Sequence, residues 1–150
     1  MICRAKSVDL PDIVEAVMPL YRESNHPFDA NREVWVRAWS GMIEGGTGVI
    51  YFGKTDDGRI MGAIGGAFFP SLNTGLLQAS ELVWYVLPEF RGHALGWALY
   101  RLFEMESKRR NVYFMTMPHL ADNDSVDTLR EFYKREGYRK METVYIKELK

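Results

Sequence analysis

The chain has 150 residues, of which 47% are hydrophobic and 26% charged, proportions typical of a single soluble globular domain. Its formal net charge of −1 gives no general attraction to nucleic acid or anionic membranes, so we expect neither as a partner. Cys3 is the only cysteine, which excludes an intramolecular disulfide, and the N-terminus lacks the apolar core of a signal peptide. We therefore expect one cytoplasmic domain over residues 1–150.

The first third of the chain predicts a short strand followed by two helices. Residues 2–6 favour the strand. Apolar residues then recur at helical spacing over 10–18, behind Asp9 as a plausible N-cap. A second helix is predicted from about Arg32 to Ile43, and the glycine-rich stretch at 45–48 ends it.

The middle of the chain predicts three strands, a helix and a fourth strand. Segments 47–54 and 59–69 flank the turn Thr55-Asp56-Asp57-Gly58, which is a strong hairpin signal. A longer strand covers 76–87. An apolar helical stripe from Leu95 to Phe103 follows, and then a buried-looking strand at 112–117.

The end of the chain predicts a last helix and a last strand. The polar run at 122–125 offers several N-caps for the helix, Gly137 fits the position after its C-cap, and 138–149 favours a strand with a bend near Met141. Hairpin-linked strands are antiparallel, whereas the crossover from 76 to 117 implies a parallel pair. The fold class is therefore mixed α/β, a mostly antiparallel sheet with helices on both faces.

The loop Arg91-Gly92-His93-Ala94-Leu95-Gly96 lies between the long strand and its helix. Amides at a helix N-terminus can bind an anion, and glycines let that anion approach closely. In the alternative interpretation, Gly92 serves only a turn and Gly96 only close packing. The chain contains neither GxxxxGK[ST] nor GxGxxG after its first strand, which argues against a P-loop or a dinucleotide fold.

The same loop resembles the acyl-coenzyme A loop of the GNAT acetyltransferase superfamily, Arg/Gln-x-x-Gly-x-Gly/Ala, with Ala94 at the usual first glycine. The stretch at 82–92 is similar to the fourth strand of that family. The stretch at 129–142 resembles its C-terminal signature, with Tyr133 on a helix and Gly137 four residues later, although Val126 replaces a frequent asparagine. Together with the element order, these motifs imply a GNAT-like acyl-CoA N-acyltransferase fold whose parallel strand pair splays apart.

This resemblance implies that acetyl-CoA is the co-substrate. The loop amides would bind its pyrophosphate, and its pantetheine arm would bond to backbone near Val86 in the gap between the splayed strands. The implied binding residues are Val86, Arg91, Gly92, His93, Ala94, Leu95 and Gly96. We expect no metal, because the three histidines are scattered and no HExxH or CxxC motif is present.

Two residues are the main candidates for proton transfer. Tyr133 matches the position at which the family often carries a tyrosine that protonates the leaving thiolate, and the alternative is a tyrosine packed in the helix stripe. Alternation places Glu81 on one strand face with the apolar Ala79, Val83 and Tyr85, where burial would raise its pKa and suit it to act as the base. Glu81 can instead pair with a cation or reach solvent, and His119 is a reserve base.

Few features of the sequence indicate which amine is acetylated. In the family, the loop between the first two helices shapes the acceptor pocket, which here is 22–31, with Trp35, Trp84 and Tyr85 as aromatic lining. Three carboxylates can attract a cationic amine: Glu23, Asp29 and Asp122.

The resulting prediction is an acetyl-CoA-dependent N-acetyltransferase that acts on a primary amine of a small molecule or protein. Two alternatives remain, an inactive acyl-CoA-binding or partner-binding module and an enzyme that acetylates aminoacyl-tRNA. The segment 141–149 can pair across a homodimer.

Overall fold

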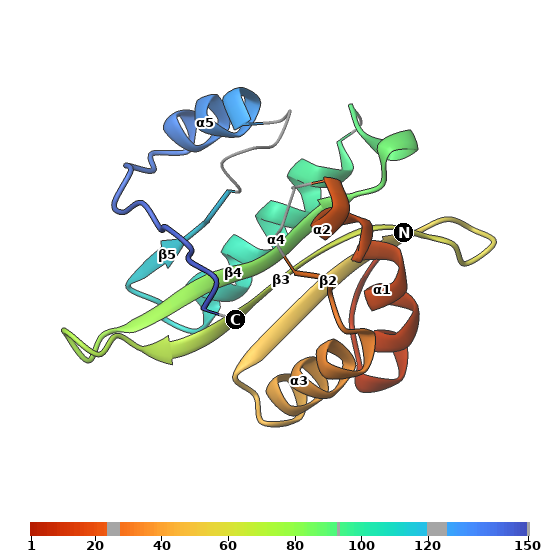
Figure 1. Cartoon of the computed structure of the whole chain (residues 1–150), viewed down its shortest axis with the longest axis horizontal. Coiled ribbons are helices and arrows are strands. Elements are labelled where there is room, and N and C mark those ends of the chain that lie inside the picture. Colours follow the sequence, from red (N-terminus) through yellow and green to blue (C-terminus); the bar gives the residue numbers. More distant parts are fainter. Residues whose placement is uncertain (24–27, 93, 120–125, 150) are drawn as a thin grey trace. The chain divides into compact units, whose positions relative to one another are not determined.

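A five-stranded sheet in the order β1-β2-β3-β4-β5 forms the centre of the first 118 residues (Figure 1). The computed structural model describes residues 1–23, 28–92, 94–119 and 126–149, and its contacts divide the chain into two compact units, Met1–Pro118 and His119–Lys150. The strands are β1 (Ile2–Arg4), β2 (Gly48–Lys54), β3 (Ile60–Pro70), β4 (Leu77–Val86) and β5 (Phe114–Thr116).

The helices lie close to the predicted positions. They are α1 (Leu10–Val17), α2 (Pro19–Glu23), α3 (Arg32–Glu44), α4 (Leu95–Arg109) and α5 (Val126–Arg135), with short 3-10 turns η1 (Ser7–Asp9) and η2 (Pro88–Phe90). The first predicted helix ends one residue early because Pro19 begins a separate turn, α2. None of the described helices is long and apolar enough to cross a membrane.

The sheet confirms the predicted mixed topology. The pairs β1–β2, β2–β3 and β3–β4 are antiparallel, whereas β4 and β5 are parallel. The crossover between β4 and β5 runs through α4, as expected for a parallel connection.

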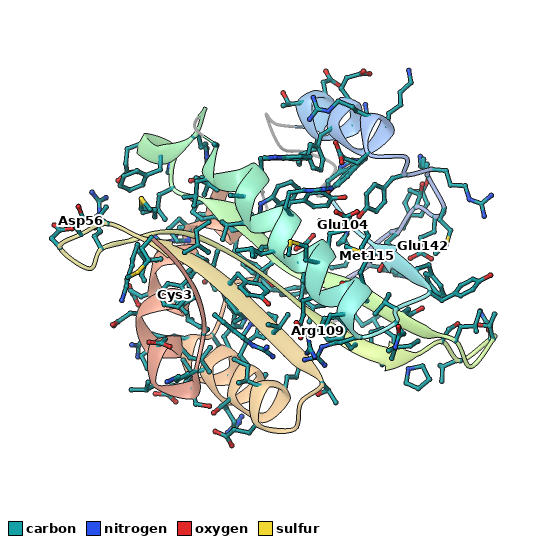
Figure 2. The ribbon with its side chains drawn as sticks, turned by 180° about the vertical axis from the view of Figure 1, so that it is seen from behind. Cys3, Asp56, Glu104, Arg109, Met115 and Glu142 are labelled. Carbon is teal, nitrogen blue, oxygen red and sulfur yellow. The ribbon has the colours of Figure 1, made fainter. Side chains whose placement is uncertain are left out.

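Two adjacent glycines of β3 show which helices cover each face. A Cβ atom on Gly65 would lie 3.0 Å from the Trp39 ring of α3, whereas one on Gly66 would meet the Phe103 ring of α4 at 2.6 Å. α1 and α3 therefore cover one face and α4 the other, as views from the front and from behind show (Figures 1 and 2). Helices on both faces were predicted, and this is confirmed.

A β-bulge interrupts the alternation of β4. Val83 pairs with Gly65 and Glu81 pairs with Gly66, which leaves Leu82 without a cross-strand partner in β3. Because directly opposed residues share a face, Val83 lies on the α1/α3 face and Glu81 on the α4 face. The expectation of one shared face for Ala79, Glu81, Val83 and Tyr85 is therefore wrong, because the extra residue reverses the alternation.

A buried carboxylate anchors the C-terminal half of α4. Glu106 accepts two hydrogen bonds from Arg109 and one from Arg110, all of 2.8 Å, and lies 3.5 Å from the guanidinium of Arg4 on β1. Arg109 marks this end of the helix in Figure 2. The hydrogen bonds from Arg109, followed by those from Arg110, lower the pKa of Glu106 to about 2. The helix is thereby linked to the opposite edge of the sheet from β5.

The second unit consists of α5 and an extended C-terminal segment. Gly137 has a φ of 82° and its amide donates to the Lys134 carbonyl, so it ends α5 as predicted. No strand is found in residues 138–149, and the predicted last strand is wrong. The sequence has strand propensity, but a strand also needs a hydrogen-bonded neighbour, and within the described residues this segment has none.

Candidate active site

The two parallel strands separate halfway along β4. Their pairing ends with Ser80 and Thr116, whose side-chain hydroxyls are joined by a hydrogen bond of 3.0 Å. β4 continues to Val86, so from Glu81 onward its edge on the β5 side has no strand partner in the part of the chain that the structure describes. We call residues 81–86 the open edge of β4. Backbone groups there can hydrogen-bond to an extended ligand.

The loop after β4 presents a helix N-terminus without a side-chain cap. The turn η2 leads into Arg91 and Gly92, and α4 begins at Leu95 with Ala94 as its N-cap. Alanine has no side-chain acceptor for the first amides of the helix, and no side chain in the described part of the chain caps them. These amides therefore remain available to an anion. His93 was also predicted to bind here, and it lies outside the described residues.

The two glycines of the loop have different roles. Gly92 adopts a φ of 78°, a left-handed conformation that favours glycine, so a turn accounts for it. Gly96 is not required by packing, because a Cβ atom there would lie 3.7 Å from Val86 Cγ2, an ordinary contact. The same contact places the first turn of α4 beside the far end of the open edge. Of the two, only Gly96 lacks a structural reason to be glycine.

Glu81 is the first residue of the open edge, and its side chain is buried, with an exposed fraction of 5%. Within the described residues it has no hydrogen bond or ion pair, in contrast to the buried Glu106. Burial alone raises the pKa of Glu81 to about 8. The predicted burial of Glu81 is confirmed, and its role as the base stays a prediction.

Arg91 is bound to the sheet and to α2. Its Nε donates to the Val86 carbonyl at 2.9 Å, and its Nη2 donates to Glu23 Oε2 at 2.6 Å. The guanidinium also lies over the Tyr85 ring, 5.2 Å from its centroid. Tyr85 in turn donates a hydrogen bond to Glu23 Oε1. Arg91 was expected to contribute a charged group for phosphate, and in this structure its charge is paired with a carboxylate.

The predicted aromatic lining of the acceptor pocket is divided between the two faces. Trp84 stacks on Tyr100 of α4, with centroids 5.9 Å apart, whereas Tyr85 belongs to the core cluster on the α1/α3 face. Trp35 of α3 packs against that cluster and contacts Tyr21 edge-on. Only Trp35 and Tyr85 therefore share a face, and a pocket that also includes Trp84 is wrong.

The predicted carboxylates also differ from expectation. Glu23 is already paired with Arg91, and Asp29 is exposed. Asp122 lies outside the described residues. Of the predicted carboxylates that the structure describes, one is therefore held by a cation and the other is open to solvent.

Tyr133 and His119 belong to the second unit. Their rings stack with centroids 6.2 Å apart, and Tyr133 also contacts the rings of Phe132 and Tyr138. The Tyr133 side chain has an exposed fraction of 9%, so both the packed and the functional interpretation of this residue remain compatible with its surroundings. The unexpected finding is that Tyr133 and the reserve base His119 are direct neighbours.

Sequence reasoning missed the link between Glu23, Tyr85 and Arg91. The first and last of these are 68 positions apart, and no local pattern connects a carboxylate at the end of one short helix with an arginine in a distant loop. The signal that was available was the type of residue at each position. It marked Glu23 and Arg91 as charged candidates, each for a different ligand.

The fold and the site define a mixed α/β protein in which two parallel strands separate, and in which the helix after the longer strand begins at an N-cap without a side-chain hydrogen bond. Residues 11–138 match the sequence model of the acetyltransferase (GNAT) family, which is most of the chain. The chain therefore belongs to the GNAT acetyltransferase family, and the family predicted from the loop and the C-terminal motif is confirmed. No curated protein sequence matches it.

Solved structures share the fold at low sequence identity. A predicted acetyltransferase from Clostridium acetobutylicum, crystallised with acetyl-CoA, has a TM-score of 0.80 at 15% identity over 99% of this chain and 96% of its own. A ribosomal-protein-alanine N-acetyltransferase from Brucella melitensis gives 0.67 at 14%, covering 99% of both chains. An aminoglycoside acetyltransferase from an uncultured soil metagenomic sample gives 0.74 at 11%, covering 100% and 96%. These likenesses establish the fold.

Proposed function

We propose that this chain is an acetyl-CoA-dependent N-acetyltransferase that transfers an acetyl group directly to a primary amine within a ternary complex. Membership of the acetyltransferase family supports the class of reaction. The observation that carries the proposal is the position of Glu81, a buried carboxylate at the start of the open edge that has no hydrogen bond or ion pair within the described residues. Such a group can take the proton of an attacking amine.

The coenzyme-binding role falls on the loop and the open edge. The backbone amides of residues 92–96 would hold the pyrophosphate, because Ala94 leaves the start of α4 uncapped and Gly96 leaves room beside it. Backbone groups near Val86 would bond to the pantetheine arm. The Val86 carbonyl already accepts one bond from Arg91, and its second lone pair remains for such a ligand. When bound, acetyl-CoA supplies the thioester that is the acetyl donor.

Two side chains would move protons during transfer. Glu81 would accept a proton from the amine as its nitrogen bonds to the acetyl carbon, and Tyr133 would give its phenolic proton to the departing sulfur as the carbon–sulfur bond breaks. The assignment of Tyr133 comes from its place in the C-terminal motif, whereas that of Glu81 comes from burial and position. His119 stays the reserve base.

The second substrate of the proposed reaction is the amine that accepts the acetyl group. Related folds act on a ribosomal-protein alanine in one case and on aminoglycosides in another. For this chain we propose a primary amine on a small molecule or on a protein. The net charge of −1 argues against a strongly anionic acceptor.

Calorimetric titration of the purified protein with acetyl-CoA and with free coenzyme A tests the proposal, with Gly96→Glu as control. We expect micromolar binding in the wild type and loss of binding in the variant, in which a carboxylate enters the phosphate site of a folded protein. Acetylation of an amine panel then tests the reaction. Binding without acetyl transfer or hydrolysis would identify a binding module, and absence of binding in a folded sample would refute the proposed role of the loop.

A further inference from the structure

We propose that Arg91 exchanges its carboxylate partner, Glu23, for a phosphate of coenzyme A, and that this exchange releases the Glu23 carboxylate to bind a cationic amine. The inference rests on the function proposed above. In this proposal Glu23 competes with the coenzyme for Arg91. Once released, it favours acceptors that carry a positive charge.

Each oxygen of the Glu23 carboxylate already has a hydrogen-bond partner in this structure, and the carboxylate charge is paired with a cation. Its Oε1 accepts the phenolic hydrogen bond of Tyr85 at 2.5 Å, and its Oε2 accepts the 2.6 Å bond from Arg91. These bonds hold the end of α2 against β4 and the coenzyme loop. A cationic amine would find no unpaired oxygen on Glu23 while Arg91 remains there.

The guanidinium of Arg91 is well placed to change partners. It belongs to the residue directly before Gly92, so it stands at the entrance of the loop proposed to hold the pyrophosphate. The side chains of Arg91 and Glu23 have exposed fractions of 43% and 36%, and ion pairs so accessible to water contribute little to stability. The Nη2 group that Arg91 offers to Glu23 can equally donate to a phosphate oxygen, so the two anions compete for it.

Release of Arg91 would change the charge on the α1/α3 face of the sheet. Tyr85 lies in the core cluster of that face and keeps its bond to Glu23, which fixes the carboxylate in place. The neutral Arg91–Glu23 ion pair is then replaced by the single negative charge of Glu23, which Tyr85 still holds by a hydrogen bond. This charge attracts an ammonium group. Coenzyme binding would thus favour binding of a cationic acceptor, and this coupling acts equally in both directions.

The test is the affinity for coenzyme A, measured by calorimetry, of Glu23→Gln beside the matched variant Glu89→Gln. Glu89 is another carboxylate near the loop, in η2, and pairs with Arg59 instead of Arg91. If Glu23 competes for Arg91, its removal strengthens coenzyme binding by about five-fold, whereas loss of a charge at Glu89 changes it by less than about two-fold. Equal effects of the two variants, or weaker binding in Glu23→Gln, would overturn the inference.

A double-mutant cycle assigns the effect to Arg91. In an Arg91→Gln background, Glu23→Gln should no longer change coenzyme affinity, since the contested cation is absent. Titration with pantetheine, which lacks the pyrophosphate, should show no difference between wild type and Glu23→Gln. A persistent effect in either case refutes the exchange. If the wild type binds coenzyme A but Glu23→Gln leaves the affinity unchanged, this inference alone is refuted. If the wild type does not bind coenzyme A, the proposed function is refuted as well.

Discussion

Glu81 and Val83 lie two positions apart on β4, yet their side chains lie on opposite faces of the sheet. The unpaired Leu82 between them causes this reversal. Val83 stays in the core under α1 and α3, while Glu81 is placed under α4, at the point where β5 leaves β4. The bulge therefore provides a carboxylate at the start of the open edge without placing a charge in the larger core.

Replacement of Glu81 by glutamine tests its role as the base. Because burial raises its pKa to about 8, the carboxylate is mostly protonated at pH 6 and becomes able to accept a proton as the pH rises. Activity of the wild type should therefore increase up to about pH 8. Glu81→Gln should lower kcat by about 100-fold or more and lose this rise. An unchanged acidic limb in the pH profile of the variant would exclude Glu81 as the base.

Tyr133→Phe tests the proposed acid. The ring contacts with His119, Phe132 and Tyr138 need no hydroxyl, so the variant should fold normally. Loss of the phenolic proton should lower kcat by about 10-fold to 100-fold with little change in the KM for acetyl-CoA. Steady-state kinetics give both constants, and an unchanged kcat would leave Tyr133 as a packing residue.

The two loop glycines should respond differently to alanine. Gly92→Ala forces a side chain into a left-handed backbone conformation and should reduce the free energy of unfolding by about 1 kcal/mol. Gly96→Ala makes an ordinary contact with Val86 and should leave that free energy unchanged or slightly higher. Denaturant unfolding of both variants measures the contrast. A larger loss for Gly96→Ala would mean that packing explains this glycine.

Glu106 should stabilise the fold above acidic pH. Its pKa falls from an ordinary value of 4.5 to about 2, so its contribution is complete above about pH 5 and is lost as the pH falls towards 2. Glu106→Gln should reduce the free energy of unfolding at pH 7 by about 3 kcal/mol, and the difference should vanish near pH 2.

Glu104→Gln is the matched control for Glu106, since it removes a carboxylate on the same helix that pairs with Arg101 and Lys108. These i,i+3 and i,i+4 pairs on the helix surface should be worth about 0.5 kcal/mol. Similar losses in the two variants would contradict the special role of Glu106.

The C-terminal segment should bring two copies of the chain together. Five of its apolar side chains have exposed fractions between 64% and 90%: Met141, Val144, Tyr145, Ile146 and Leu149. A sequence of this kind gains hydrogen bonds and apolar burial when it pairs with another strand. Sedimentation should detect a homodimer at micromolar concentration, and Ile146→Lys should dissociate it. A single monomeric mass for the wild type would rule the pairing out.

Local patterns were sufficient to predict most of the fold. The turn at Thr55-Asp56-Asp57-Gly58, the stripe of α4 and the glycine after α5 each depend on neighbouring residues, and each is found where expected. The last strand was wrong because strand formation over 138–149 depends on a partner elsewhere. Sequence propensity describes only the segment itself.

The site was predictable in its residue types and not in its geometry. A carboxylate in an apolar strand and a glycine loop before a helix were visible in the sequence. The bulge at Leu82 was not, since the residue types along the strand do not show where an extra residue reverses the alternation. The pairing of Arg91 with Glu23 was hidden for a related reason, because long-range ion pairs have no sequence spacing.

The edge strand β5 pairs with only the first half of β4, so the sheet is one strand narrower along the open edge. At about 3.3 Å per residue, the stretch from Glu81 to Val86 is roughly 20 Å long, and on its β5 side no described strand pairs with it. A ligand that hydrogen-bonds along this stretch would act as a temporary sixth strand. The amides of that half of β4 that point away from β3 would then exchange with solvent quickly in the empty protein and slowly in the complex, so the strand itself would report occupancy without any label.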